Sequence, residues 1–158
     1  MNDKMLRKHL AELLSGGGAH ADWKAALREI PAKLRGVRPD GMGHSVWELL
    51  EHMRIAQWDI LEFSRNSKHV SPDWPRGYWP ETPEPPNAKA WAKSVKLFAR
   101  DLAAMKKLVA NPRINLFARI PYGNGQTVLR EAMLVADHNA YHLGQVILTR
   151  RVLGAWKE

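Results

Sequence analysis

Asp137-His138-Asn139-Ala140-Tyr141-His142-Leu143-Gly144-Gln145 is the segment around which the chain is organised. It lies within residues 127–153, which contain no proline and one glycine and therefore predict a single helix about 40 Å long. Residues four apart on a helix lie on one face, one turn above each other, so His138 and His142 present two imidazoles to one point. This spacing is a familiar arrangement of metal ligands. Two half-buried histidines bonded to their neighbours are the structural alternative.

The face that carries the two histidines continues along the helix in steps of three and four residues. Its members are Glu131, Val135, His138, His142, Gln145 and Thr149. Apolar residues occupy the neighbouring faces, so a polar line runs among apolar side chains. A helix of this length must bury its apolar faces against other parts of the protein.

The composition is that of one domain spanning residues 1–158, since a 45% hydrophobic content at this length suits a single core. The chain contains no cysteine, which excludes disulfides and thiolate ligands, so any metal must be held by nitrogen and oxygen. No apolar run approaches the ~20 residues of a membrane span, and the first nine residues lack a signal-peptide core. We therefore expect a cytoplasmic protein with no membrane partner.

Much of the formal charge of +8 is concentrated in one predicted helix. Lys89, Lys93, Lys96 and Arg100 form a basic stripe along one helical face. We interpret this basic stripe as the solvated outer face of a bundle helix. No nucleic-acid-binding motif accompanies it, so nucleic acid is not an expected partner, and only non-specific, salt-sensitive association with anions would follow from it.

Hydrophobic periodicity divides the chain into helices and two irregular connections. The predicted helices cover residues 3–14, 19–30, 45–64, 88–110 and 127–153. Ser45 and Glu48 form a capping-box pattern at the start of the third of these, and Asn87 is a suitable N-cap for the fourth. We therefore expect an all-α protein of four main helices, preceded by a short leading helix.

Residues 65–87 form a long connection that contains six of the ten prolines. A segment of this length without periodicity is uncommon inside a compact domain, and a crossover that lets the flanking helices lie parallel is one physical reason for it. Its aromatic residues Trp74, Tyr78 and Trp79 should pack on the bundle, either as core cover or over the mouth of a site.

A third histidine, His52, lies in the helix that Ser45 caps. Sites in helical bundles are built from side chains that project inward from facing helices, so His52 can meet His138 and His142 if those two helices are neighbours. Three neutral imidazoles leave coordination positions open, as in reactive metal sites. Four residues are candidates to support the metal ligands by helical position alone, although structural roles explain each of them: Glu48, Asp59, Glu131 and Gln145.

Two blocks of the sequence resemble the DinB/YfiT-like superfamily. They are Ser45-Val46-Trp47-Glu48-Leu49-Leu50-Glu51-His52 and Ala136-Asp137-His138-Asn139-Ala140-Tyr141-His142-Leu143-Gly144-Gln145. The loop 73–80 and the tail 150–156 are similar to that superfamily too. The resemblance implies a four-helix bundle of up-down-down-up topology, with a divalent metal held by one histidine of helix two and two of helix four. Those positions fall on His52, His138 and His142.

The same resemblance implies an activity class. Members with an assigned activity are mostly thiol-dependent transferases and isomerases that use bacillithiol, mycothiol or glutathione. We therefore expect a divalent transition metal (nickel, zinc or iron), a low-molecular-weight thiol as cosubstrate and a small electrophilic substrate. No catalytic base is identified, and the sequence leaves a homodimer open.

Two other interpretations stand beside the transferase. In one, a metal-dependent hydrolase uses metal-bound water as its nucleophile. In the other, the protein is a stress-associated metal-binding scaffold that catalyses no reaction. The basic stripe would then support non-specific binding of anionic partners.

Overall fold

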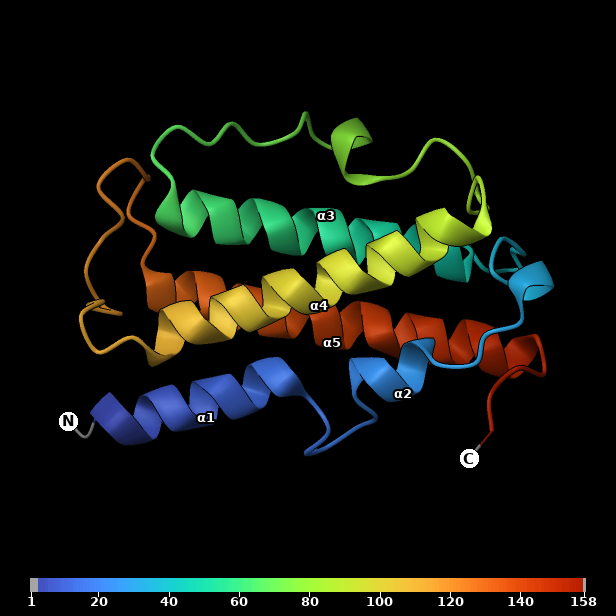
Figure 1. The fold of residues 1–158 in the computed structure, drawn as a ribbon, viewed down its shortest axis with the longest axis horizontal. Helices are drawn as coiled ribbons and strands as arrows, with labels where there is room; N and C mark the ends of the chain where they lie inside the picture. The colour runs from blue at the N-terminus through green and yellow to red at the C-terminus, as the bar shows by residue number, and fades with distance from the viewer. Residues whose placement is uncertain (1–2, 158) are drawn as a thin grey trace.

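The computed structural model describes residues 3–157, and this part of the chain forms helices and loops with no β-strand (Figure 1). The predicted all-α class is therefore confirmed. The α-helices are α1 (Asp3–Ser15), α2 (Trp23–Leu27), α3 (Val46–Arg65), α4 (Ala88–Ala110) and α5 (Val128–Val152). Two 3-10 turns, η1 (Ala32–Leu34) and η2 (Arg76–Tyr78), lie in the connections.

Side-chain caps set the starts of the three longest helices. At α3, the Glu48 backbone N–H donates to Ser45 Oγ, and the Ser45 N–H donates back to the Glu48 carboxylate at 2.8 Å. Asn87 and Thr127 accept bonds from the first turns of α4 and α5. These bonds satisfy N–H groups that have no partner within a helix. The caps expected at Ser45 and Asn87 are thus present.

The first part of the chain differs from the sequence prediction. The leading helix α1 is the longer element, with 13 residues, whereas the helix expected over residues 19–30 shrinks to the five residues of α2. Asp22 caps α2 by accepting a bond from the Ala25 N–H, which delays its start. At its other end Glu29 has a φ of 54°, a left-handed conformation that a helix cannot contain, and Pro31 follows closely.

The long helices pack into a bundle around one core. α3 packs against both α4 and α5, and α1 lies along α4 and α5, so α1 serves as the member that the sequence assigned to residues 19–30. In Figure 1, α3 and α4 run in one direction, whereas α1 and α5 run in the opposite direction. The interior residues Leu50, Met53, Phe98, Met105 and Val146 have no exposed surface.

A buried polar chain ties three helices together close to the histidines. The Gln57 side chain of α3 donates to the Phe98 carbonyl of α4 at 2.8 Å. Asn139 of α5 in turn donates to the Gln57 Oε1 at 2.8 Å. Because unpaired polar groups are costly in a core, this chain favours one register of α5 against α3. Asn139 directly follows His138, so the same register places that histidine.

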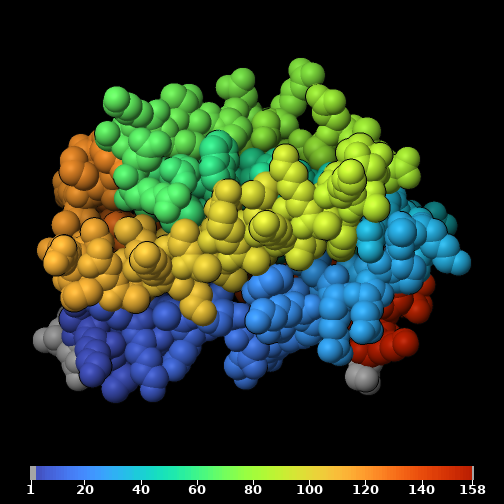
Figure 2. Space-filling view, viewed as in Figure 1, coloured from blue at the N-terminus to red at the C-terminus, as the bar shows by residue number. Residues whose placement is uncertain are grey.

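The connection 66–87 runs along the bundle beside α3, and its only helical turn is η2 (Figure 1). Figure 2 shows this segment on one side of α4 and the chain before α3 on the other. Lys89, Lys93, Lys96 and Arg100 of the basic stripe are exposed on α4. No helix in residues 3–157 is both long enough and apolar enough to cross a membrane.

Candidate metal centre

Three histidines from two neighbouring helices meet at one point. His52 comes from the second turn of α3, whereas His138 and His142 come from successive turns of α5. Their candidate ligand nitrogens all lie within 4.8 Å of one another. The Nε2 atoms of His52 and His138 are 3.0 Å apart, and the His142 ring centroid lies 4.6 Å from that of His52 and 4.5 Å from that of His138. This group could hold a metal ion.

The second ring nitrogen of two of these histidines has a hydrogen-bond acceptor. His52 Nδ1 lies 3.0 Å from the Tyr78 carbonyl oxygen, and His142 Nδ1 lies 2.7 Å from Gln145 Oε1. Each Nδ1–H therefore donates to its oxygen, which leaves the Nε2 lone pair free to face the centre. Metal-binding histidines are oriented in this way in other proteins.

Burial keeps the three imidazoles neutral. The pKa of His138 is lowered to about 3, chiefly by burial and additionally by charges on His142 and His52. The pKa values of His52 and His142 are also lowered, chiefly by burial and additionally by a charge on His44, despite the opposing hydrogen bonds to Tyr78 and Gln145. Neutral imidazoles at pH 7 are the protonation state that binds metal.

The donor set fits a divalent transition metal. Imidazole nitrogen suits nickel, zinc and iron, whereas magnesium and calcium prefer oxygen. Within residues 3–157, no other histidine, aspartate or glutamate joins the group. Structural zinc sites are closed by four protein ligands, so a set of three leaves room for a ligand from solution.

The four candidate supporting residues have different positions in the structure. Gln145 contacts His142 directly. Glu48 is occupied by the helix cap and by Arg38, and Glu131 accepts a 2.7 Å bond from the neighbouring Arg130. Asp59 is linked to His52 only through Tyr78. It accepts a 2.6 Å bond from the Tyr78 hydroxyl, and the Tyr78 carbonyl accepts a bond from His52.

The three aromatic residues of the connection also differ from one another. Trp79 stacks on the His52 ring with centroids 4.0 Å apart and an interplanar angle of 3°. Tyr78 contributes its carbonyl and its hydroxyl, as described above. Trp74 is 74% exposed and packs edge-on against Tyr78.

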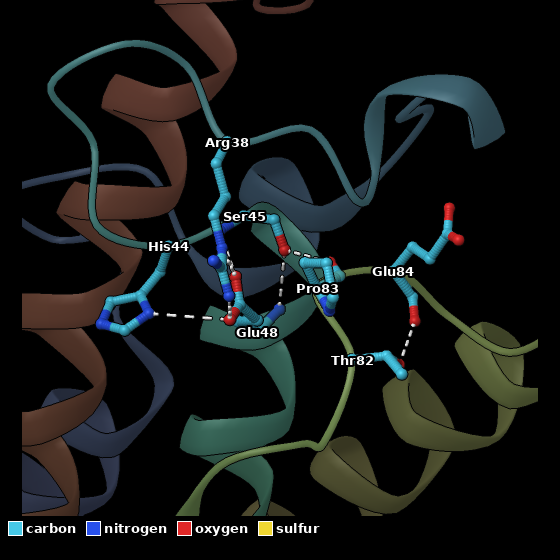
Figure 3. Close-up of polar contacts among 7 residues, drawn as sticks. All are labelled: Arg38, His44, Ser45, Glu48, Thr82, Pro83 and Glu84. Atoms are coloured by element: carbon cyan, nitrogen blue, oxygen red, sulfur yellow. Dashed lines mark hydrogen bonds and ion pairs between the residues drawn. The ribbon is translucent and has the colours of Figure 1, made fainter.

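Three residues near the centre were not expected from the sequence. His44 stacks on Trp79 at 4.0 Å, and Arg38 binds the Glu48 carboxylate through two nitrogens (Figure 3). His69, from the connection, bonds to Asp59 at 2.7 Å. All three lie in irregular segments, where no periodic pattern indicates which way a side chain points. The position of His44 directly before the Ser45 cap was the only available signal.

The fold and site define a class of protein: an all-α bundle with three inward-facing histidines on two of its long helices. A family model described as the DinB superfamily matches residues 18–146, and the chain belongs to that superfamily. The matched range contains all three histidines. Searches of curated proteins and of solved structures gave no match.

Proposed function

We propose that this protein is a metal-dependent thiol transferase or isomerase that joins a low-molecular-weight thiol to a small electrophile. The observation that carries the proposal is the set of three converging imidazoles with no fourth protein ligand in residues 3–157. Such a set can hold a metal and still admit a ligand from solution.

A divalent metal held there would lower the pKa of a coordinating thiol, as bound metal ions do for thiols generally. His52, His138 and His142 would hold the ion. The Tyr78 carbonyl and the Gln145 side chain fix the rings of His52 and His142, so little reorganisation is needed on binding.

In the reaction, the thiol sulfur forms a bond to an electrophilic carbon of the substrate. In a transfer, the leaving group departs with its electron pair; in an isomerisation, the sulfur adds and is later expelled. The thiol proton passes to solvent, because the nearby carboxylates are occupied: Arg38 and the cap bind Glu48, and Tyr78 and His69 bind Asp59. We therefore assign no general base.

The testing experiment uses the cobalt-substituted protein. A low-molecular-weight thiol should bind the cobalt directly and produce a sulfur-to-metal charge-transfer band. The band should be absent in His142→Ala, and thiol transfer to an electrophile should require His142 as well. His20→Ala is a matched control, because His20 is exposed on the loop between α1 and α2.

The outcome separates the transferase from its alternatives. If no thiol perturbs the cobalt spectrum, the transferase proposal is wrong, and a metal-stabilised scaffold or a hydrolase becomes the better description.

The helix directions in Figure 1 support the up-down-down-up order that the resemblance implies.

A further inference from the structure

His44 lies beside the three-histidine centre, although no role has so far been assigned to it. Trp79 stacks with His44 and with His52, and both centroid separations are 4.0 Å, with interplanar angles of 18° and 3°. The His44 and His52 ring centroids are therefore no farther apart than twice that distance. A charge on His44 lowers the pKa values of both His52 and His142, in agreement with this proximity.

The ring nitrogens of His44 make no hydrogen bond in the described part of the chain, and the polar contact of Nδ1 is an ion-pair distance to Glu48. Its Nδ1 lies 3.9 Å from Glu48 Oε1, which is too far for a hydrogen bond, and His44 makes no other hydrogen bond within residues 3–157. The side chain is 42% exposed. Figure 3 shows its second ring nitrogen pointing away from Glu48. This nitrogen is available to a ligand.

The local charge balance permits an anionic ligand. Although burial raises the pKa of Glu48, hydrogen bonds from Arg38 and Ser45 lower it more, so the carboxylate is ionised at neutral pH. Arg38 binds that carboxylate through two nitrogens and neutralises its charge. Glu48 therefore does not repel an anion that approaches His44, while a ring nitrogen of His44 can supply an N–H donor.

We propose that His44 forms an anion subsite that binds a carboxylate of the thiol cosubstrate while the three-histidine centre takes its sulfur. This inference rests on the proposed function, because it concerns the same bound molecule. It makes cosubstrate recognition a two-point contact, with sulfur at one end and a carboxylate at the other. Trp79 forms the apolar wall between the two points.

The test compares two thiols of similar size on the cobalt-loaded protein, 3-mercaptopropionate and 2-mercaptoethanol. Their dissociation constants are measured from the charge-transfer band. The wild type should bind the carboxylate-bearing thiol about tenfold more tightly, the effect of one hydrogen bond to a charged group. His44→Phe retains an aromatic ring against Trp79 but removes both nitrogens. It should abolish the preference and leave the 2-mercaptoethanol constant unchanged.

His9→Phe is the matched control, because His9 is an exposed histidine that also lies beside a glutamate, Glu12. It should retain the tenfold preference. If His44→Phe keeps the preference, or weakens both thiols equally, His44 only packs against Trp79 and the subsite is wrong while the thiol chemistry stands. If neither thiol produces a band on the wild type, both the proposed function and the subsite are disproved. Thermal unfolding of His44→Phe confirms that the variant is folded.

Discussion

The hydroxyl of Tyr78 donates a 2.6 Å hydrogen bond to Oδ2 of Asp59, a buried residue two turns beyond His52 on α3. The other oxygen of the same carboxylate bonds to His69 at 2.7 Å. One buried acid thus holds the connection 66–87 at two places. Since the Tyr78 carbonyl accepts the Nδ1–H of His52, this acid also fixes the loop atom that orients a metal-site histidine.

Tyr78→Phe should therefore destabilise the protein and weaken metal binding together. The change removes the bond to a buried carboxylate, which should lower the free energy of unfolding by about 1–3 kcal/mol. Burial and the Asp59 contact raise the pKa of the Tyr78 hydroxyl to about 12, so it is protonated and able to donate at neutral pH. Urea unfolding and a metal titration measure the two effects. Tyr122→Phe, at a 42% exposed tyrosine, should change neither.

The metal content should depend on the three histidines alone. The wild type should bind about one nickel, zinc or iron ion per chain in preference to magnesium or calcium. The double variant His52→Ala/His142→Ala should bind none, as elemental analysis after dialysis would show. The double variant His9→Ala/His20→Ala alters two exposed histidines and should retain the metal. Full metal retention in the first double variant would disprove the site.

Gln145→Leu tests the support of His142 separately from the ligand itself. Loss of the 2.7 Å bond from His142 Nδ1 leaves that ring without an orienting acceptor, and changes of this kind weaken metal affinity by about 10–100-fold. The metal content at saturation should stay at one ion per chain. A competition titration with a chelator measures the loss. An affinity equal to wild type would mean that packing alone positions His142.

The features that could be predicted from the sequence are those with a fixed local geometry. The spacing of His138 and His142 follows from helix geometry, and the Ser45 capping box located the start of α3. Once α3 and α5 were taken as neighbours, His52 was the one histidine on the facing helix. These inferences need only the period of a helix and the chemistry of its ends.

The features that could not be predicted depend on contacts between distant segments. His44 and His69 lie in loops, and their places beside Trp79 and Asp59 follow from how those loops cross the bundle. Arg7 would be expected on the surface, but it is buried and donates to the Val109 carbonyl within the end of α4 and to the Ile114 carbonyl beyond it. No sequence pattern indicates which carbonyls lack a partner until the helices are packed.

The basic stripe can be removed with little consequence if it is a solvated face. Lys89→Gln/Lys93→Gln/Lys96→Gln should change the free energy of unfolding by no more than about 0.5 kcal/mol, because all three side chains are exposed. Thiol binding at the metal should be unaffected. Fluorescence anisotropy with a labelled DNA duplex at physiological salt tests the alternative, that the stripe binds nucleic acid. Tight binding by the wild type that the variant loses would instead favour an anionic macromolecular partner.

The metal-free protein should lose stability as the pH falls below about 6.5, the ordinary pKa of histidine. Burial and the neighbouring His142 and His52 together lower the pKa of His138 to about 3, so between these pH values the unfolded chain takes up a proton that the folded chain does not. The free energy of unfolding then falls with decreasing pH, by at most about 1.4 kcal/mol per pH unit for this residue. Above pH 6.5 both states are neutral at His138 and the effect is absent.

His138→Gln isolates this contribution, because the carboxylates titrate in both proteins and cancel in the comparison. Urea unfolding of the metal-free wild type at pH 7 and pH 5.5 should show a larger loss of stability than the variant shows, by up to about 1.3 kcal/mol. Metal should raise wild-type stability at pH 7 and do so less at pH 5.5, since protons compete for the ligand nitrogens. Equal losses in the two metal-free proteins would mean that His138 is solvated and that burial does not hold it neutral.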